Sequence, residues 1–121
     1  MKQSYTVVGT NNLANATKYY DALFQETEFK RVIADERMTY WGCDWMMFAV
    51  ASPYNKEAAT NGNGTMIGLN LNSTEEVDNL YQKAIALGGS CEGEPKLKGP
   101  YYSAYVRDLD KNKLCLFFQV A

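Results

Sequence analysis

The chain has 121 residues with a formal net charge of −2, and 46% of them are apolar and 21% charged, a composition typical of one globular domain. No window approaches the roughly 18 apolar residues of a membrane helix, and no Lys/Arg cluster supplies the positive patch of a nucleic-acid-binding protein, so we expect neither a membrane nor a nucleic acid as partner. The sequence also contains no histidine, so metal binding and general base catalysis would have to use carboxylates, cysteines, tyrosines or lysines.

The first half of the chain predicts the order β-α-β-β-β. Residues 4–9 form a short β-rich run, and the segment 11–24 has apolar residues at helical spacing, with Asn12 as its N-cap. Turn signals such as Gly42 to Asp44 separate three further β-rich runs, near 29–35, 38–42 and 45–51.

The second half repeats this order after a polar linker, residues 52–64. A strand at 65–71 precedes a helix at 73–89, where Ser73 and Glu76 are expected to form a capping box and Gly88-Gly89 to end the helix. A shift of 61 residues aligns the apolar positions of the first strand and helix of one half with those of the other half, so that Tyr5 matches Met66. The remaining predicted strands lie near 90–96, 101–107 and 113–120.

Two repeated modules, at about 1–60 and 61–121, are therefore expected to make one domain of the α+β class. Each module alone is too small to bury a good core. Two modules side by side can form a cupped, eight-stranded mixed sheet with the helices outside, and the concave inner face is the natural place for a small molecule.

The paired arrangement resembles the vicinal oxygen chelate superfamily, which includes glyoxalase I, bleomycin-resistance proteins and extradiol dioxygenases. Three segments carry the resemblance: "VVGTNNLANATKYYDALF" (7–24), "NGNGTMIGLNLNSTEEVDNLYQKAIALGGS" (61–90) and "GPYYSAYVRDLDKNKL" (99–114). They are similar to the family's first strand and helix, its fifth strand and second helix, and its closing hairpin.

The resemblance implies where a divalent metal would be held in enzymes of this superfamily. Their ligands are His, Gln or Glu side chains, and those positions fall here on Tyr5, Met66 and Cys115, with the fourth near Met47. None of these residue types is a usual ligand of catalytic zinc, iron or manganese. We therefore expect a member of the superfamily that binds no metal and needs no cofactor.

Two features of the sequence suggest a reactive or metal-binding site but are better explained structurally. Asp108, Asp110 and Asn112 begin like a calcium loop, but Lys113 occupies the sixth position, where glycine is needed, so a hairpin turn is expected. Cys115 lies among leucines and phenylalanines with no histidine to activate it, which favours a buried, unreactive thiol over a nucleophile.

The expected pocket is apolar, polarizable and rimmed with phenol hydroxyls. Alternation along 101–107 sends Tyr101, Ser103 and Tyr105 to one face and Tyr102, Ala104 and Val106 to the other, so at least one tyrosine of this strand should reach the cup. Such a lining suits a flat or aromatic ligand. The predicted ligand-binding residues are Tyr5, Met47, Met66, Tyr102, Tyr105, Cys115 and Phe117.

These observations lead to a leading functional hypothesis, an enzymatic alternative and a third possibility, an assembly protein whose cup is filled by Tyr5, Met66 and Phe117. The leading hypothesis is a metal-free protein that binds or sequesters a small apolar or aromatic molecule, similar in this logic to bleomycin-resistance proteins, and that forms a homodimer as family members usually do. The alternative is a metal-independent lyase, isomerase or glyoxalase-like enzyme that uses a tyrosine, a cysteine or a pocket carboxylate. We expect a cytoplasmic protein, because residues 1–12 lack the long apolar stretch of a secretory signal and the three cysteines lie in distant contexts.

Overall fold

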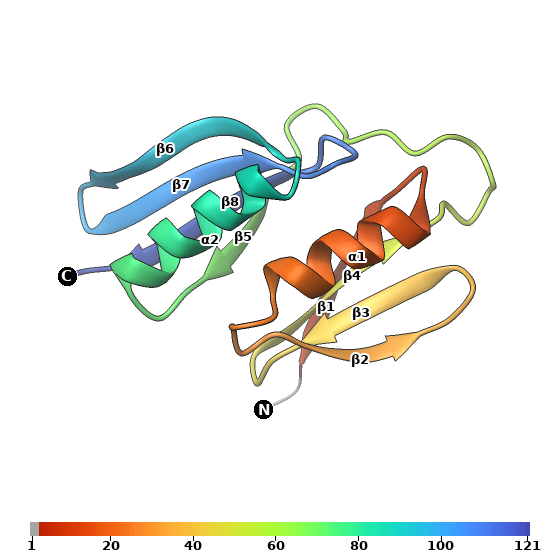
Figure 1. The fold of residues 1–121 in the computed structure, drawn as a ribbon, viewed down its shortest axis with the longest axis horizontal. Helices are drawn as coiled ribbons and strands as arrows, with labels where there is room; N and C mark the ends of the chain where they lie inside the picture. Colours follow the sequence, from red (N-terminus) through yellow and green to blue (C-terminus); the bar gives the residue numbers. More distant parts are fainter. Residues whose placement is uncertain (1–2) are drawn as a thin grey trace. The chain divides into compact units, whose positions relative to one another are not determined.

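The structure is a computed structural model that describes residues 3–121, and the chain divides into two compact units, residues 1–61 and 62–121. Each unit has the predicted order β-α-β-β-β, so the α+β class and the repeat are confirmed (Figure 1). The strands form two four-stranded sheets, one in each unit.

The first unit places one helix on one face of its sheet (Figure 1). Its strands follow the spatial order β1-β4-β3-β2, with β1 parallel to β4 and the other pairs antiparallel. The elements are β1 (Ser4–Gly9), α1 (Leu13–Leu23), β2 (Lys30–Ala34), β3 (Met38–Gly42) and β4 (Met46–Ala51).

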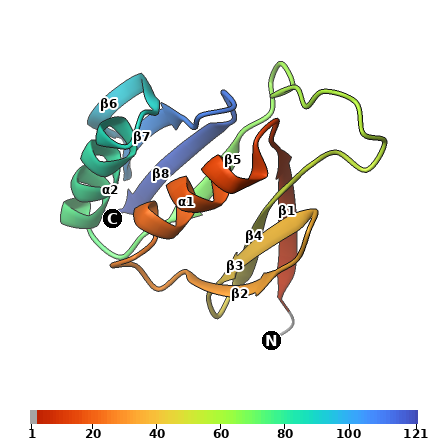
Figure 2. The ribbon, with the colours of Figure 1, turned by 45° about the vertical axis from the view of Figure 1, so that its right-hand side comes forward.

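The second unit repeats this topology. Its order is β5-β8-β7-β6, again with the first strand of the unit parallel to the last. The elements are β5 (Ile67–Asn70), α2 (Thr74–Ala86), β6 (Ser90–Lys98), β7 (Tyr101–Arg107) and β8 (Lys113–Gln119), and Figure 2 shows α2 lying along one face of this sheet.

Both helices begin where the sequence predicts. The Asn12 side chain accepts a hydrogen bond from the Asn15 N–H at 3.1 Å, and Ser73 Oγ accepts one from the Glu76 N–H at 3.0 Å. Glu76 Oε1 in turn accepts from the Asn72 N–H at 2.9 Å, one residue before the position that a capping box uses. These bonds satisfy N–H groups that have no partner inside the helix.

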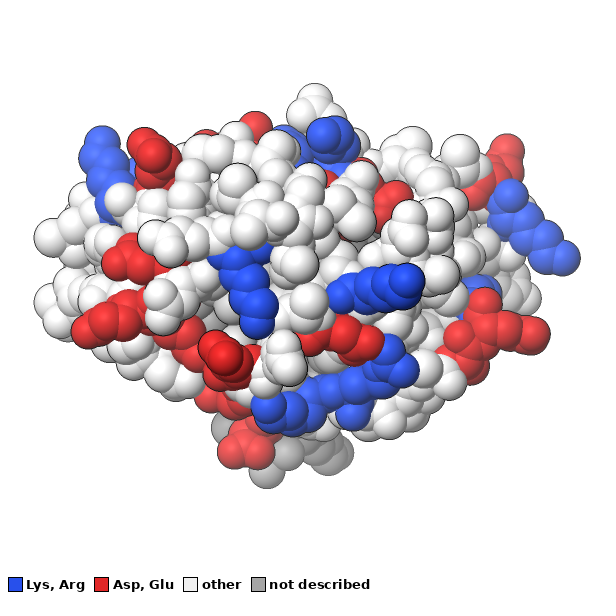
Figure 3. Space-filling model, viewed as in Figure 1, with Lys and Arg blue, Asp and Glu red and all other residues white. Residues whose placement is uncertain are grey.

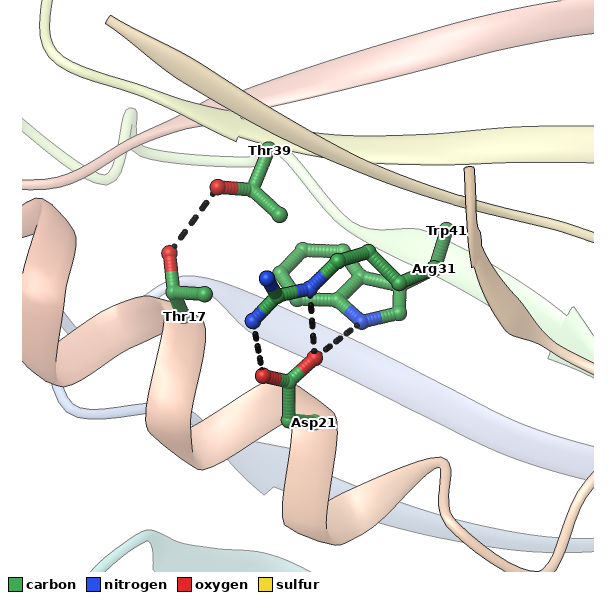
Figure 4. A network of polar contacts seen from close by, with 5 residues as sticks. All are labelled: Thr17, Asp21, Arg31, Thr39 and Trp41. Atoms are coloured by element: carbon green, nitrogen blue, oxygen red, sulfur yellow. Dashed lines mark hydrogen bonds and ion pairs between the residues drawn. The ribbon is translucent and has the colours of Figure 1, made fainter. Parts of the chain in front are cut away.

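Polar contacts fasten α1 to its sheet. Asp21 Oδ1 accepts hydrogen bonds from Trp41 Nε1 at 2.9 Å and Arg31 Nε at 3.1 Å, and Asp21 also forms an ion pair with the Arg31 guanidinium (Figure 4). The Thr17 and Thr39 hydroxyls meet at 3.0 Å. Trp41 is buried and its ring packs against Tyr20 of the helix, so apolar burial and hydrogen bonding hold the same interface.

The predicted hairpin turn is confirmed between β7 and β8. Asp108 Oδ1 accepts hydrogen bonds from the N–H groups of Asp110 and Asn112, at 2.8 and 2.9 Å, and Asp108 Oδ2 accepts from Asn112 Nδ2 at 3.0 Å. The carboxylate therefore organises the turn from within it, as an Asp in an Asx turn does.

The linker after β4 is held against the first unit. Asn11 Oδ1 accepts from the Ala59 N–H at 2.7 Å, and Asn11 Nδ2 donates to the Ala59 carbonyl at 3.2 Å. A Cβ at Gly9 would lie 2.9 Å from the Ala59 Cβ, so this approach requires glycine. Within residues 3–121, neither helix has the length and apolar character needed to cross a membrane.

Candidate functional site

A hollow of about 360 Å³ lies on the face of the second sheet away from α2. Strands β6, β7 and β8 provide its lining: Lys98, Tyr101, Ser103, Tyr105, Cys115 and Phe117. The site is thus built entirely within residues 62–121.

Strand register brings these side chains together. Tyr105 lies directly opposite Cys115, and Ser103 lies opposite Phe117, so alternate residues of β7 and β8 share one face. The Tyr101 and Phe117 rings meet edge to face, with their centroids 6.0 Å apart. The hollow is therefore lined by a thiol and a hydroxyl beside a pair of aromatic rings in contact.

A glycine makes room for the Tyr105 ring. Gly93 of β6 is the register partner of Tyr105, and a Cβ at this position would lie 2.9 Å from Tyr105 Cδ2. Real Cβ atoms do not approach carbon so closely, so any larger residue at Gly93 would displace the ring.

Two lysines flank the same tyrosine. The Nζ atoms of Lys98 and Lys113 lie 4.8 and 5.5 Å from the Tyr105 ring centroid, in the range of cation–π contacts. Burial raises the pKa of the Cys115 thiol, although hydrogen bonds from Tyr105 and Ser103 and the charges of both lysines act the other way. Repulsion from Cys115, followed by burial, raises the pKa of Tyr105. Near neutral pH the hollow thus contains a neutral thiol and a neutral phenol beside two ammonium groups.

The structure brings three of the predicted residues together: Tyr105, Cys115 and Phe117. Tyr102 lies on the other face of β7, where its hydroxyl donates to Asp78 Oδ1 of α2 at 2.6 Å. Tyr102 therefore does not line this hollow, because alternation along a strand lets Tyr105 or Tyr102 face it but not both. The hydrogen bond to Asp78 also raises the pKa of Tyr102.

Met66 lies beside a neighbouring hollow of about 310 Å³. It precedes β5 and shares this second hollow with Arg107 and Lys113, the lysine that also lies over the Tyr105 ring. Met66 is therefore close to the site but does not line the hollow that contains Cys115.

Tyr5 and Met47 lie in the first unit. They are register partners on β1 and β4, and the Tyr5 ring meets Tyr40 edge to face at 5.9 Å. The Tyr5 side chain is 59% exposed, so it lies on an open sheet face of that unit.

The positions that would hold a metal in this superfamily fit one poorly. Cys115 has a raised pKa and two lysines near it, whereas a thiol binds metal as a thiolate and ammonium groups repel a cation. Tyr5, Met47 and Met66 add a phenol and two thioethers, which are poor ligands for hard or borderline ions. Across residues 3–121, no three His, Cys, Asp or Glu side chains converge as metal ligands would.

Sequence reasoning overlooked several lining residues. Lys98 falls beyond the predicted end of its strand at residue 96, because β6 continues to the turn at Gly99. Tyr101 and Ser103 share a face with Tyr105 by alternation, and that signal was sufficient to find them. Another hollow, of about 510 Å³, was also missed; it lies in the first unit between the β2–β3 turn and residues 52–58 and is lined by Arg37 and Tyr54, among others.

Searches by sequence find no matching family model and no matching curated protein. The fold matches a glyoxalase/bleomycin resistance protein from Albidiferax ferrireducens T118, with 32% identity, a TM-score of 0.90 and 98% of each chain covered. A glyoxalase/bleomycin resistance protein/dioxygenase family enzyme from Burkholderia phytofirmans PsJN matches with 18% identity and a TM-score of 0.79, over 95% of this chain and 96% of that one. Lactoylglutathione lyase from Agrobacterium tumefaciens matches with 16% identity and a TM-score of 0.72, over 97% and 92% of the two chains.

Proposed function

Because this chain belongs to the glyoxalase/bleomycin resistance protein family, with the vicinal oxygen chelate fold, we propose that it binds a small aromatic molecule in the hollow of its second sheet, without a metal. One observation carries the proposal. The hollow combines aromatic walls, Tyr101 and Phe117, with a sulfur atom and two hydroxyl groups, a lining that favours a flat ring by stacking and polarizable contact and orients it by hydrogen bonds.

A library of aromatic compounds tests this proposal, with binding detected by ligand-observed NMR and measured by calorimetry. Phe117→Ala removes one wall of the hollow and should weaken binding about tenfold. Phe118→Ala is the matched control, because Phe118 is the adjacent, half-buried residue that faces the other way, opposite Tyr102. Failure of every compound to bind more tightly than millimolar would contradict the proposal.

The hollow gives less support to the enzyme alternative. Its six lining residues, all from the fully described second unit, include no carboxylate. Its thiol and phenol have raised pKa values, so neither is a base near neutral pH. Catalysis here would need a base from outside this set of residues.

We also propose a homodimer in the cytoplasm. The outer strand β2 supports the dimer, because it forms an edge of its sheet and leaves Val32 and Ile33 more than half exposed. Light scattering coupled to size exclusion should give twice the chain mass, and a monomer mass at micromolar concentration would reject the dimer.

A further inference from the structure

Cationic side chains of the second sheet gather on the face that holds the hollow. Residues directly opposite each other in a ladder share a face. Lys96 and Lys98 lie opposite Ser103 and Tyr101, and Lys113 lies opposite Arg107, each in register with the lining residues. The face therefore carries four cations: Lys96, Lys98, Arg107 and Lys113.

Carboxylates do not balance these charges. Glu92 forms an ion pair with Arg107 at 3.1 Å. Two other carboxylates lie on the helix side: Asp78 accepts a hydrogen bond from Tyr102, and the charge of Glu94 helps to raise the pKa of Tyr81 on α2. Within residues 62–121, neither Lys98 nor Lys113 forms an ion pair with a carboxylate. The face is positive although the chain as a whole has a net charge of −2.

This one-sided arrangement differs from the surface that Figure 3 draws. There, Lys and Arg side chains alternate with Asp and Glu side chains, as on an ordinary soluble protein.

The groups inside the hollow leave the two ammonium charges uncompensated. A cation–π contact at a partly exposed site is weak and neutralises no charge. The Tyr105 hydroxyl and the Cys115 thiol stay protonated near neutral pH, because the pKa of each is raised. An anionic group of a ligand would neutralise the charges of both lysines. The hydroxyls of Ser103 and Tyr105 can donate hydrogen bonds to the same group.

We propose, on the basis of the proposed binding function, that the ligand is an aromatic carboxylate, whose ring packs against Tyr101 and Phe117 and whose acid group binds Lys98 and Lys113. Both parts of such a molecule have a counterpart in the hollow. A neutral ring would leave the ammonium groups unpaired, and an inorganic anion would leave the aromatic walls uncovered.

Three matched probes test the inference by calorimetry: 2-naphthoate, 2-naphthamide and 2-naphthylmethylammonium. At about 50 mM salt, where screening is weak, naphthoate should bind about tenfold more tightly than the amide, and the ammonium probe least tightly. The double variant Lys98→Gln/Lys113→Gln should remove most of this preference while still binding the amide. Lys83→Gln on α2 is the control that should keep the preference intact.

The outcomes separate the two proposals. Equal binding of naphthoate and naphthamide by the wild-type protein would overturn the carboxylate inference and leave aromatic binding in place. A preference that persists in the double variant would overturn the assignment to these two lysines. Failure of all three probes to bind would count against the binding function itself.

Discussion

Tyr105 lies directly opposite Cys115 across β7 and β8, and the two side chains meet inside the hollow beneath two lysines. The pair looks like a phenol and a thiol ready for acid–base chemistry. Both pKa values are raised, however, so the pair is neutral near pH 7 and acts through its shape, polarizability and hydrogen bonds.

Cys115 should therefore react slowly with iodoacetamide at neutral pH, because the thiolate is the nucleophile and burial disfavours it. In a Cys43→Ser/Cys91→Ser background, its alkylation rate should rise only at a pH above the usual range for a thiol. Tyr105→Phe removes a hydrogen bond that lowers the thiol pKa, so the whole rate profile should move to still higher pH. Alkylation as fast as that of exposed Cys91 in the native protein at pH 7 would contradict this expectation.

Gly93→Ala should weaken ligand binding severalfold by displacing a ring. The new Cβ would meet Tyr105 Cδ2 at 2.9 Å, so the tyrosine must move within the hollow that it lines. Calorimetry with the tightest aromatic ligand measures the effect, and the Tyr105 ring resonances report the movement. The paired variant Gly93→Ala/Tyr105→Ala relieves the contact. A loss of affinity on adding Gly93→Ala to the Tyr105→Ala protein, equal to the loss in wild type, would show that the ring does not transmit the effect.

The fold could be predicted from the sequence because helix caps and turn residues mark the ends of the elements in each half. Asn12 and Ser73 cap helices that begin at the expected places, and the turn from Asp108 to Asn112 closes the predicted hairpin. Local rules of this kind need only neighbouring residues. The site was harder to predict, because its composition depends on which face of a strand turns inward and on where β6 ends.

Tyr102 and Lys98 illustrate these two difficulties. Residues an odd number of positions apart on a strand point to opposite faces, so Tyr102 bonds to Asp78 of α2 while Tyr105, three positions later, enters the hollow. Lys98 lies beyond residue 96, where the predicted strand ends, yet β6 continues to it and delivers a charge to the site. The positive character of the hollow rests on that one extension and on Lys113.

Asp21→Ala should lower the free energy of unfolding by about 1–3 kcal/mol, because the indole N–H of the buried Trp41 loses its acceptor. Asp21→Asn should lower it less, since an amide oxygen can still accept from Trp41. The ion pair with Arg31 contributes little to this difference, because both of its side chains are more than a third exposed. Urea denaturation measures the effects, with Asp44→Ala at an exposed turn as the control. Equal effects of Asp21→Ala and Asp44→Ala would rule out the contact with Trp41 as a stabilising bond.

Asp108→Ala should destabilise the second unit more than Asp110→Ala. The Asp108 carboxylate accepts two backbone N–H groups and the Asn112 side chain, and both Asp108 and Asn112 are buried, so removal of the acceptor leaves desolvated donors unpaired. Because these oxygens already bind donors within the turn, calcium should not change the midpoint of thermal unfolding. A rise in that midpoint with millimolar calcium, lost in Asp108→Ala, would instead identify the turn as an ion site. Together the two measurements decide whether the D-x-D-x-N sequence serves the backbone or a metal.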